Sequence, residues 1–176
     1  MINKLRSNYQ LSNVLIRIAF VLAYVLYSWQ SSLAVATLMF KDFALQSSGT
    51  YGLWVALLTS ALLGVILMFL TPVISNSFLN FSRFYNVPRA EYALLTHLFF
   101  TLYFAICGVL RLINLITPLL LVWGDVLFPL LSSLGCVVWF YAVTAKLYFN
   151  EQTKPYYFRN LALTYVVLIV VAEVLL

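Results

Sequence analysis

Charged side chains are scarce in this chain of 176 residues. Only 9% of the residues are charged, with 10 Lys and Arg against 5 Asp and Glu, while 64% are hydrophobic and the mean hydropathy is +1.00. A soluble domain carries roughly 25% charged residues, so this composition cannot supply a water-facing surface. The scarcity excludes a soluble globular domain and predicts an integral membrane protein, whose first partner is the lipid bilayer.

Groups that carry out chemistry are equally few. Two cysteines lie inside apolar runs without metal-ligand spacing, which is typical of small packing residues, and a lone histidine cannot build a zinc or haem site. No two acidic residues are placed to act together as acid and base. We therefore expect no catalytic residues, no metal and no cofactor, and no enzyme activity. These residues are Cys107 and Cys136; His97; and Asp42, Glu91, Asp125, Glu151 and Glu173.

Long hydrophobic runs are what the chain has instead. About 20 helical residues cross a bilayer core of roughly 30 Å, and five runs are of about this length. We expect an all-α polytopic bundle, a single integral membrane domain over residues 1–176, with spans at 18–40, 51–74, 92–112, 126–147 and 157–176. The first run has no convincing cleavage site, so it is interpreted as a retained span.

The basic residues predict the orientation. With a cytoplasmic N-terminus, eight of them fall on the inner side and two, Lys41 and Arg111, on the outer side. The eight are Lys4, Arg6, Arg17, Arg83, Arg89, Lys146, Lys154 and Arg159. They are scattered in short loops, which indicates orientation signals and not a nucleic-acid surface. We expect a multi-pass protein of a cell membrane, namely a bacterial inner membrane.

Two connecting segments are too apolar to be ordinary loops. Residues 75–91 mix phenylalanines with Ser, Asn and Arg before Pro88, which suits a short helix lying in the membrane interface. Residues 112–124 are apolar, too short to span, and contain Pro118. We expect both segments to be interfacial or re-entrant.

Arg111 and Asp125 bracket the second of these segments. Counting helical rise from both flanking spans places both charges at the outer membrane edge. The favoured interpretation is a snorkelling arginine and an aspartate at a helix start. A structural ion pair between them and a ligand or ion site remain open.

Polar side chains also occur inside two spans. The stretch "SWQSS" places Ser28, Gln30 and Ser32 near the middle of the first span, and His97 and Thr101 share a face of the third. Small residues at this spacing favour close helix packing, whereas an intramembrane ionisable or amide group is a functional candidate. Helix packing is the favoured interpretation for the first span, with a polar cavity or pathway as the alternative. For His97, interhelical hydrogen bonding is favoured, with proton or ligand handling as the alternative.

The second half of the chain resembles a known class. "EYALLTHLFFTLYFAI" and "WFYAVTAKLYFNEQTKPYYFRNLALTYVVLIVV" resemble the C-terminal half of uncharacterised polytopic bacterial membrane proteins, and the five-span layout is similar to that of Yip-family proteins. A metal-binding N-terminal ribbon, often present in that class, is absent here. The resemblance implies a helical membrane fold and supplies no catalytic residues.

These observations favour a small non-enzymatic membrane protein. We expect a sensor, scaffold or accessory subunit that acts through helix–helix association, as a homo-oligomer or with a partner membrane protein. The alternatives are a channel or transporter with a polar path near Gln30, His97 and Thr101, and a lipid-modifying enzyme with a cavity beside His97 or Glu91.

Overall fold

The computed structural model describes residues 9–39, 50–116 and 127–175, and side chains over a smaller part of these ranges. The described residues form helices and short turns, which confirms the expected all-α class for this part of the chain. The helices are α2 (Tyr9–Met39), α4 (Thr50–Phe81), α5 (Arg89–Ile116), α6 (Leu127–Tyr148) and α7 (Lys154–Leu175).

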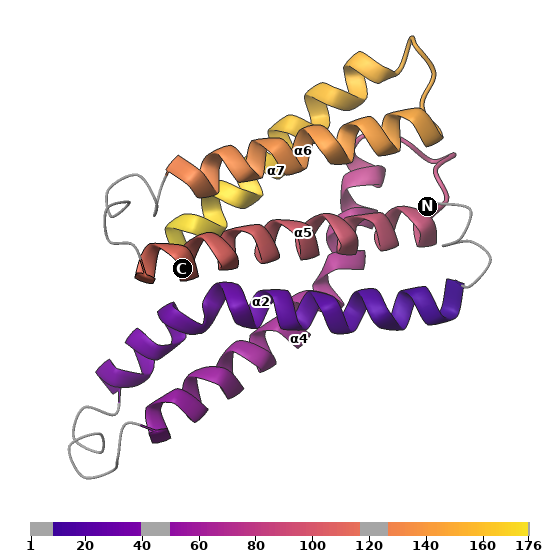
Figure 1. Cartoon of the computed structure of the whole chain (residues 1–176). Helices are drawn as coiled ribbons and strands as arrows, with labels where there is room; N and C mark the ends of the chain where they lie inside the picture. Colours follow the sequence, from indigo (N-terminus) through magenta and orange to yellow (C-terminus); the bar gives the residue numbers. More distant parts are fainter. Residues whose placement is uncertain (1–8, 40–49, 117–126, 176) are drawn as a thin grey trace.

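Helix α5 lies in the middle of the bundle. Helix α2 and the first half of α4 lie on one side of it, and α6 and α7 lie on the other (Figure 1). The second half of α4 crosses α5, so that Phe78 packs against Tyr157 and Tyr165 of α7. The core between them is unusually rich in aromatic rings, which meet mostly edge to face, the arrangement that ring quadrupoles favour. Its fully buried rings are Phe20, Tyr27, Tyr92, Phe99, Tyr103, Phe140, Tyr157 and Tyr165.

Among the described residues, three helical stretches are long and apolar enough to cross a membrane: Gly52–Phe81, Arg89–Ile113 and Leu130–Tyr148. They indicate a membrane-associated protein, in agreement with the composition. The described apolar part of α2, Asn13–Trp29, is shorter. The number of spans and their orientation stay predictions.

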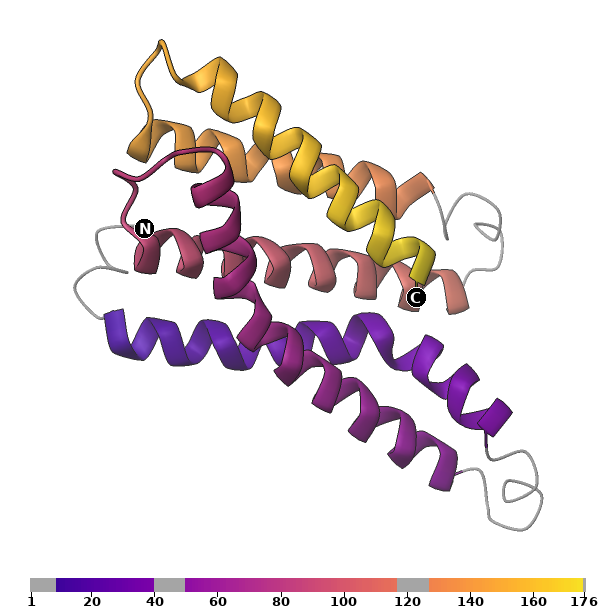
Figure 2. The same ribbon diagram turned by 180° about the vertical axis from the view of Figure 1, so that it is seen from behind.

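The segment 75–91 differs from its prediction, because no separate helix forms there. Helix α4 continues past Pro72 to Phe81, and only residues 82–88 leave the helix before α5 begins. Figure 2 shows the second half of α4 turning as it passes α2 and α5. Proline removes one intrahelical hydrogen bond and bends a helix, but the chain resumes helical geometry on the far side.

Helix α4 ends in a Schellman motif. The amide of Phe84 donates to the carbonyl of Leu79 at 2.9 Å, and the amide of Arg83 donates to that of Asn80 at 3.1 Å. Arg83 takes the left-handed conformation with φ of 59°, a position that glycine usually fills. This motif ends α4 at Phe81, whereas hydropathy predicts an end near residue 74.

Two other predicted boundaries also shift. Helix α2 begins at Tyr9, nine residues before the predicted span, because the polar lead-in continues the helix outside the apolar stretch. Helix α5 continues to Ile116, so residues 112–116 are helical and not part of a connector. The rest of the predicted 112–124 segment lies outside the described residues.

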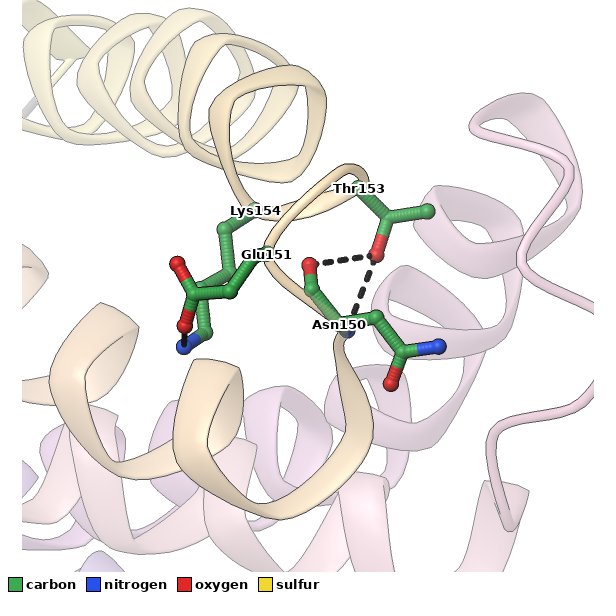
Figure 3. A network of polar contacts seen from close by, with 4 residues as sticks. All are labelled: Asn150, Glu151, Thr153 and Lys154. Atoms are coloured by element: carbon green, nitrogen blue, oxygen red, sulfur yellow. Dashed lines mark hydrogen bonds and ion pairs between the residues drawn. The ribbon is translucent and has the colours of Figure 1, made fainter.

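The turn between α6 and α7 is held by its own polar side chains (Figure 3). The Thr153 hydroxyl accepts a hydrogen bond from the backbone N–H of Asn150 at 3.1 Å and donates one to the backbone carbonyl of Asn150 at 3.0 Å. Glu151 and Lys154 form an exposed ion pair, which contributes little to stability. The local turn therefore sets the start of α7, just before Pro155.

A chain of buried hydroxyl groups connects α5, α6 and α7. The Tyr157 hydroxyl lies 2.6 Å from that of Thr144 and 3.2 Å from that of Tyr92. Thr144 also donates to the Phe140 carbonyl at 2.6 Å. Since each hydroxyl has one proton, this leaves Tyr157 donating to Thr144 and Tyr92 donating to Tyr157.

Candidate functional site

His97 lies where α5 crosses the bend in α4. Its side chain is only 2% exposed, and its Nε2 lies 3.0 Å from the carbonyl oxygen of Met68. Met68 is four residues before Pro72, which has no amide proton to give to that carbonyl. The imidazole therefore replaces the hydrogen bond that proline removes.

The second ring nitrogen of His97 also lies at hydrogen-bonding distance from a backbone carbonyl oxygen. Nδ1 lies 3.0 Å from the Ala93 carbonyl oxygen, one turn earlier on α5. That oxygen already receives the backbone amide of His97 within the helix, whereas the Met68 oxygen has no intrahelical donor. A neutral imidazole can donate to only one of the two carbonyls, and the Met68 oxygen is the one that lacks an intrahelical donor.

A cavity of about 210 Å³ opens beside His97, between α2, α4 and α5. Each helix contributes side chains spaced by about one turn, so that one face of each points inward. The lining residues are Asn13 and Arg17 from α2, Pro72 and Asn76 from α4, and Arg89, Ala90, Ala93, Leu94 and His97 from α5.

Two residues that line this cavity each have a buried polar atom without a partner among the described residues. The Nε of Arg17 and the Oδ1 of Asn76 are buried and have no hydrogen bond among the described residues. Arg89 reaches Asn80, whose Oδ1 accepts from its Nη2 at 3.0 Å. No carboxylate of the described residues lines the cavity. The described side chains that line it therefore carry net positive charge, from Arg17 and Arg89.

Arg111 is connected to α2. Its Nη1 donates to the Tyr27 carbonyl at 2.9 Å, and its guanidinium lies 4.1 Å from the centroid of the Tyr27 ring. Asp125 falls outside the described residues, so the structure does not test an ion pair between the two. The observed contacts give Arg111 a role in joining α2 to α5 that the sequence did not predict.

The other predicted polar residues bond within their own helices. Ser28 donates to the Tyr24 carbonyl at 2.9 Å, and Thr101 donates to the His97 carbonyl at 2.7 Å. Of the side chains of Gln30 and Ser32 nothing is described. The structure places His97 and Thr101 one turn apart on α5, and Ser28 on α2.

Glu91 points away from the cavity, toward α6. Its Oε2 accepts from the Tyr148 hydroxyl at 3.1 Å. Within the described ranges, no group of three or more His, Cys, Asp or Glu side chains is placed to hold a metal ion.

An apolar groove of about 320 Å³ lies between α5 and α6, lined by Leu102 and Ile106 from α5 and by Ser132, Gly135, Cys136 and Trp139 from α6. Gly135 is exposed, and a Cβ atom built on it would meet nothing within 4 Å. Three of the four residues that α6 contributes are small. The backbone of α6 is therefore accessible along this groove.

Sequence reasoning missed Arg17, Asn76 and Arg89 as site residues. Arg17 was interpreted only as an orientation signal, and Asn76 only as part of an interfacial loop. The i, i+4 spacing of Asn13 with Arg17 and of Pro72 with Asn76 was visible. Which helix faces meet depends on packing, however, so that spacing alone could not bring the pairs together.

Comparison of the chain with protein-family models, curated proteins and solved structures found no match.

Proposed function

We propose that the protein is a non-enzymatic membrane scaffold or accessory subunit that assembles with copies of itself through the groove between α5 and α6. In this proposal it is a multi-pass protein of a cell membrane, with the N-terminus on the cytoplasmic side as the charge bias predicts. The observation that carries the proposal is Gly135, which is exposed at the groove and would meet no atom within 4 Å if it carried a Cβ.

The glycines of the bundle differ in what they contact. A Cβ on Gly64 would lie 3.1 Å from the Tyr24 ring, and one on Gly108 would lie 2.8 Å from Leu26. Both glycines therefore allow close contact inside the bundle. Gly135 has the same lack of a side chain but no internal neighbour to accommodate. In a membrane, small residues let a second helix approach the backbone closely.

Helix α4 offers a surface that complements this groove. Only 17% of its apolar stretch is buried, against 50% for α5. Its exposed side chains follow one helical face and include Leu58, Leu62 and Phe69, each more than half exposed. Large side chains on one copy and a groove of small residues on the next can interdigitate, which makes a heterologous contact between copies.

The geometry of the polar residues supports an assembly role over transport or catalysis. His97 and Thr101 both direct polar atoms at backbone carbonyls. Around them lie the aromatic rings Phe20 and Phe104, which pack edge to face. Of the two, His97 joins α5 to α4 through the Met68 carbonyl, whereas Thr101 bonds within α5.

The test is the mass of the protein in mild detergent and in nanodiscs. The wild type is expected to be an oligomer, and Gly135→Leu, which fills the groove, is expected to weaken association at least tenfold. Leu62→Ala, which removes a side chain from the α4 ridge, should weaken it in the same direction.

The matched control is Leu134→Phe. Leu134 is 51% exposed and does not line the groove, so added bulk there should leave the mass unchanged. A wild type that is monomeric at all accessible concentrations would overturn the proposal. Equal masses for the wild type and Gly135→Leu would do the same.

A further inference from the structure

We propose that the cavity between α2, α4 and α5 binds a phosphate group, either on the headgroup of an anionic phospholipid or as free phosphate. This site is separate from the groove between α5 and α6, and the inference does not depend on self-association.

Charge is the first argument. Arg17 and Arg89 line the cavity together with His97, and no Asp or Glu of the described residues does. Of the carboxylates whose side chains are described, Glu91 bonds to Tyr148 and Glu151 to Lys154. Neither neutralises the two arginines. Arg89 is exposed and Arg17 half-buried, with the Nε of Arg17 shielded from water, and the planar donors of a guanidinium match phosphate oxygens.

Unused hydrogen-bonding capacity is the second argument. The buried Nε of Arg17 donates to nothing among the described residues, although it can only donate. The Asn76 side chain lines the same space, also without a partner at its Oδ1, and rotation of its amide presents two donors instead. A bound phosphate oxygen would satisfy both side chains.

The start of α5 is the third argument. Arg89 and Ala90 belong to the first turn of the helix, where backbone amides have no intrahelical acceptor. Both residues line the cavity. The positive end of the helix dipole therefore adds to the arginine charges, an arrangement that favours anions.

The cavity also has the size and position that the ligand requires. Its volume of about 210 Å³ exceeds the roughly 10–15 Å³ that one water molecule needs, and Ala90 and Ala93 leave the space open. The cavity extends along α5 from Arg89, at the end of the bundle where that helix begins, to His97, a distance of about 12 Å at the helical rise per residue. A site at the end of a membrane bundle is accessible to headgroups and to solvent.

Binding can be measured on the whole protein in two ways. In nanodiscs of phosphatidylcholine containing a minor fraction of phosphatidylglycerol, native mass spectrometry counts the retained anionic lipid. In detergent, the rise in Tm with inorganic phosphate, compared with chloride at equal ionic strength, reports the free anion. Retention of phosphatidylglycerol without a phosphate response assigns a lipid headgroup, and a phosphate response shows that the free anion is accepted.

Variants connect binding to the cavity. Arg17→Gln is expected to weaken binding at least tenfold, whereas Arg159→Gln, which removes the same charge from exposed α7, should leave it unchanged. Should Arg17→Gln fail to fold, Ala90→Leu provides the second test. Ala90 is exposed and lines the cavity, so a leucine there fills part of the space without changing the charge. We expect it to weaken binding as much as Arg17→Gln does.

Three results would overturn the proposal. The first is wild type that neither retains phosphatidylglycerol over phosphatidylcholine nor responds to phosphate, since the cavity then holds water. The second is equal binding by wild type, Arg17→Gln and Ala90→Leu. The third is an acidic protein segment that copurifies with wild type and is lost in Arg17→Gln, with no dependence on lipid or phosphate.

Discussion

His97 and Met68 are joined by a hydrogen bond between the Nε2 of the imidazole and a backbone carbonyl oxygen 3.0 Å away. The carbonyl is available because Pro72 cannot donate to it. The only histidine of the chain thus compensates for the proline inside α4 and fixes the crossing of α4 and α5.

This pairing predicts a coupled response to mutation. His97→Leu should destabilise the protein by about 1–3 kcal/mol, since it leaves a buried carbonyl unsatisfied. In a Pro72→Ala background the same change should cost less, because the alanine introduced there supplies the missing amide proton. A double-mutant cycle on unfolding in detergent measures the coupling. Identical costs in both backgrounds would show that His97 does not serve the Met68 carbonyl.

Substitution of Arg111 can distinguish two roles: a charge that only snorkels at the membrane edge, and a specific contact with Tyr27 of α2. It donates to the Tyr27 carbonyl and lies over the Tyr27 ring. Arg111→Lys keeps the charge and can still snorkel, but it loses the planar group that bonds and stacks at once. We expect a loss of about 1 kcal/mol in unfolding free energy for Arg111→Lys, and more for Arg111→Gln. If lysine substitutes without loss, the contact with α2 contributes nothing.

Two buried tyrosines of α7 form a matched pair. Tyr157 and Tyr165 are both 0% exposed, and the Tyr157 hydroxyl bonds to Thr144 and Tyr92, whereas that of Tyr165 lies near Thr96 and Tyr92 without forming a hydrogen bond of normal geometry to the described residues. Tyr157→Phe should lower the unfolding free energy by about 1–3 kcal/mol, because it leaves these hydroxyls without their partner. Tyr165→Phe should be neutral or stabilising. Thermal or denaturant unfolding of the two variants side by side decides this, and the opposite order would contradict it.

The glycines predict a second contrast. A Cβ at position 108 would come within 2.8 Å of Leu26 and 3.1 Å of the Tyr27 backbone nitrogen, so Gly108→Ala must push α2 away from α5. We expect a cost of about 1–3 kcal/mol. Gly135→Ala meets no neighbour and should gain up to about 1 kcal/mol from helix propensity. Stability measured under conditions that keep the protein monomeric separates this effect from self-association.

Much of the architecture could be predicted because hydropathy and helix length are local properties. Each of the five helices covers most of its predicted run. The ends were wrong where backbone chemistry determined them. Arg83 closes a Schellman motif after Phe81, which hydropathy does not register. Helix α2 begins at Tyr9 because helical hydrogen bonds continue outside the apolar stretch.

The candidate sites depended on tertiary structure to different degrees. His97 was identifiable in advance, as the one ionisable ring inside an apolar run. Its partner Met68 was not, because the bond is to a backbone carbonyl that any residue type carries. Arg17 and Asn76 are separated by more than fifty residues, and only the crossing of α2 with α4 and α5 places them around one cavity.

By itself, the sequence determined the class of this protein: a helical chain with too few charges to form a water-facing surface. The class follows from composition and from the length of the apolar runs, because apolar helices of this length are stable in lipid whereas unpaired polar backbone groups are not. The tertiary structure decided which polar groups meet and which remain unpaired. Helices pack by the shape of their faces, so the pairing of His97 with the carbonyl of Met68, and the cavity beside them, arise only when α4 and α5 cross.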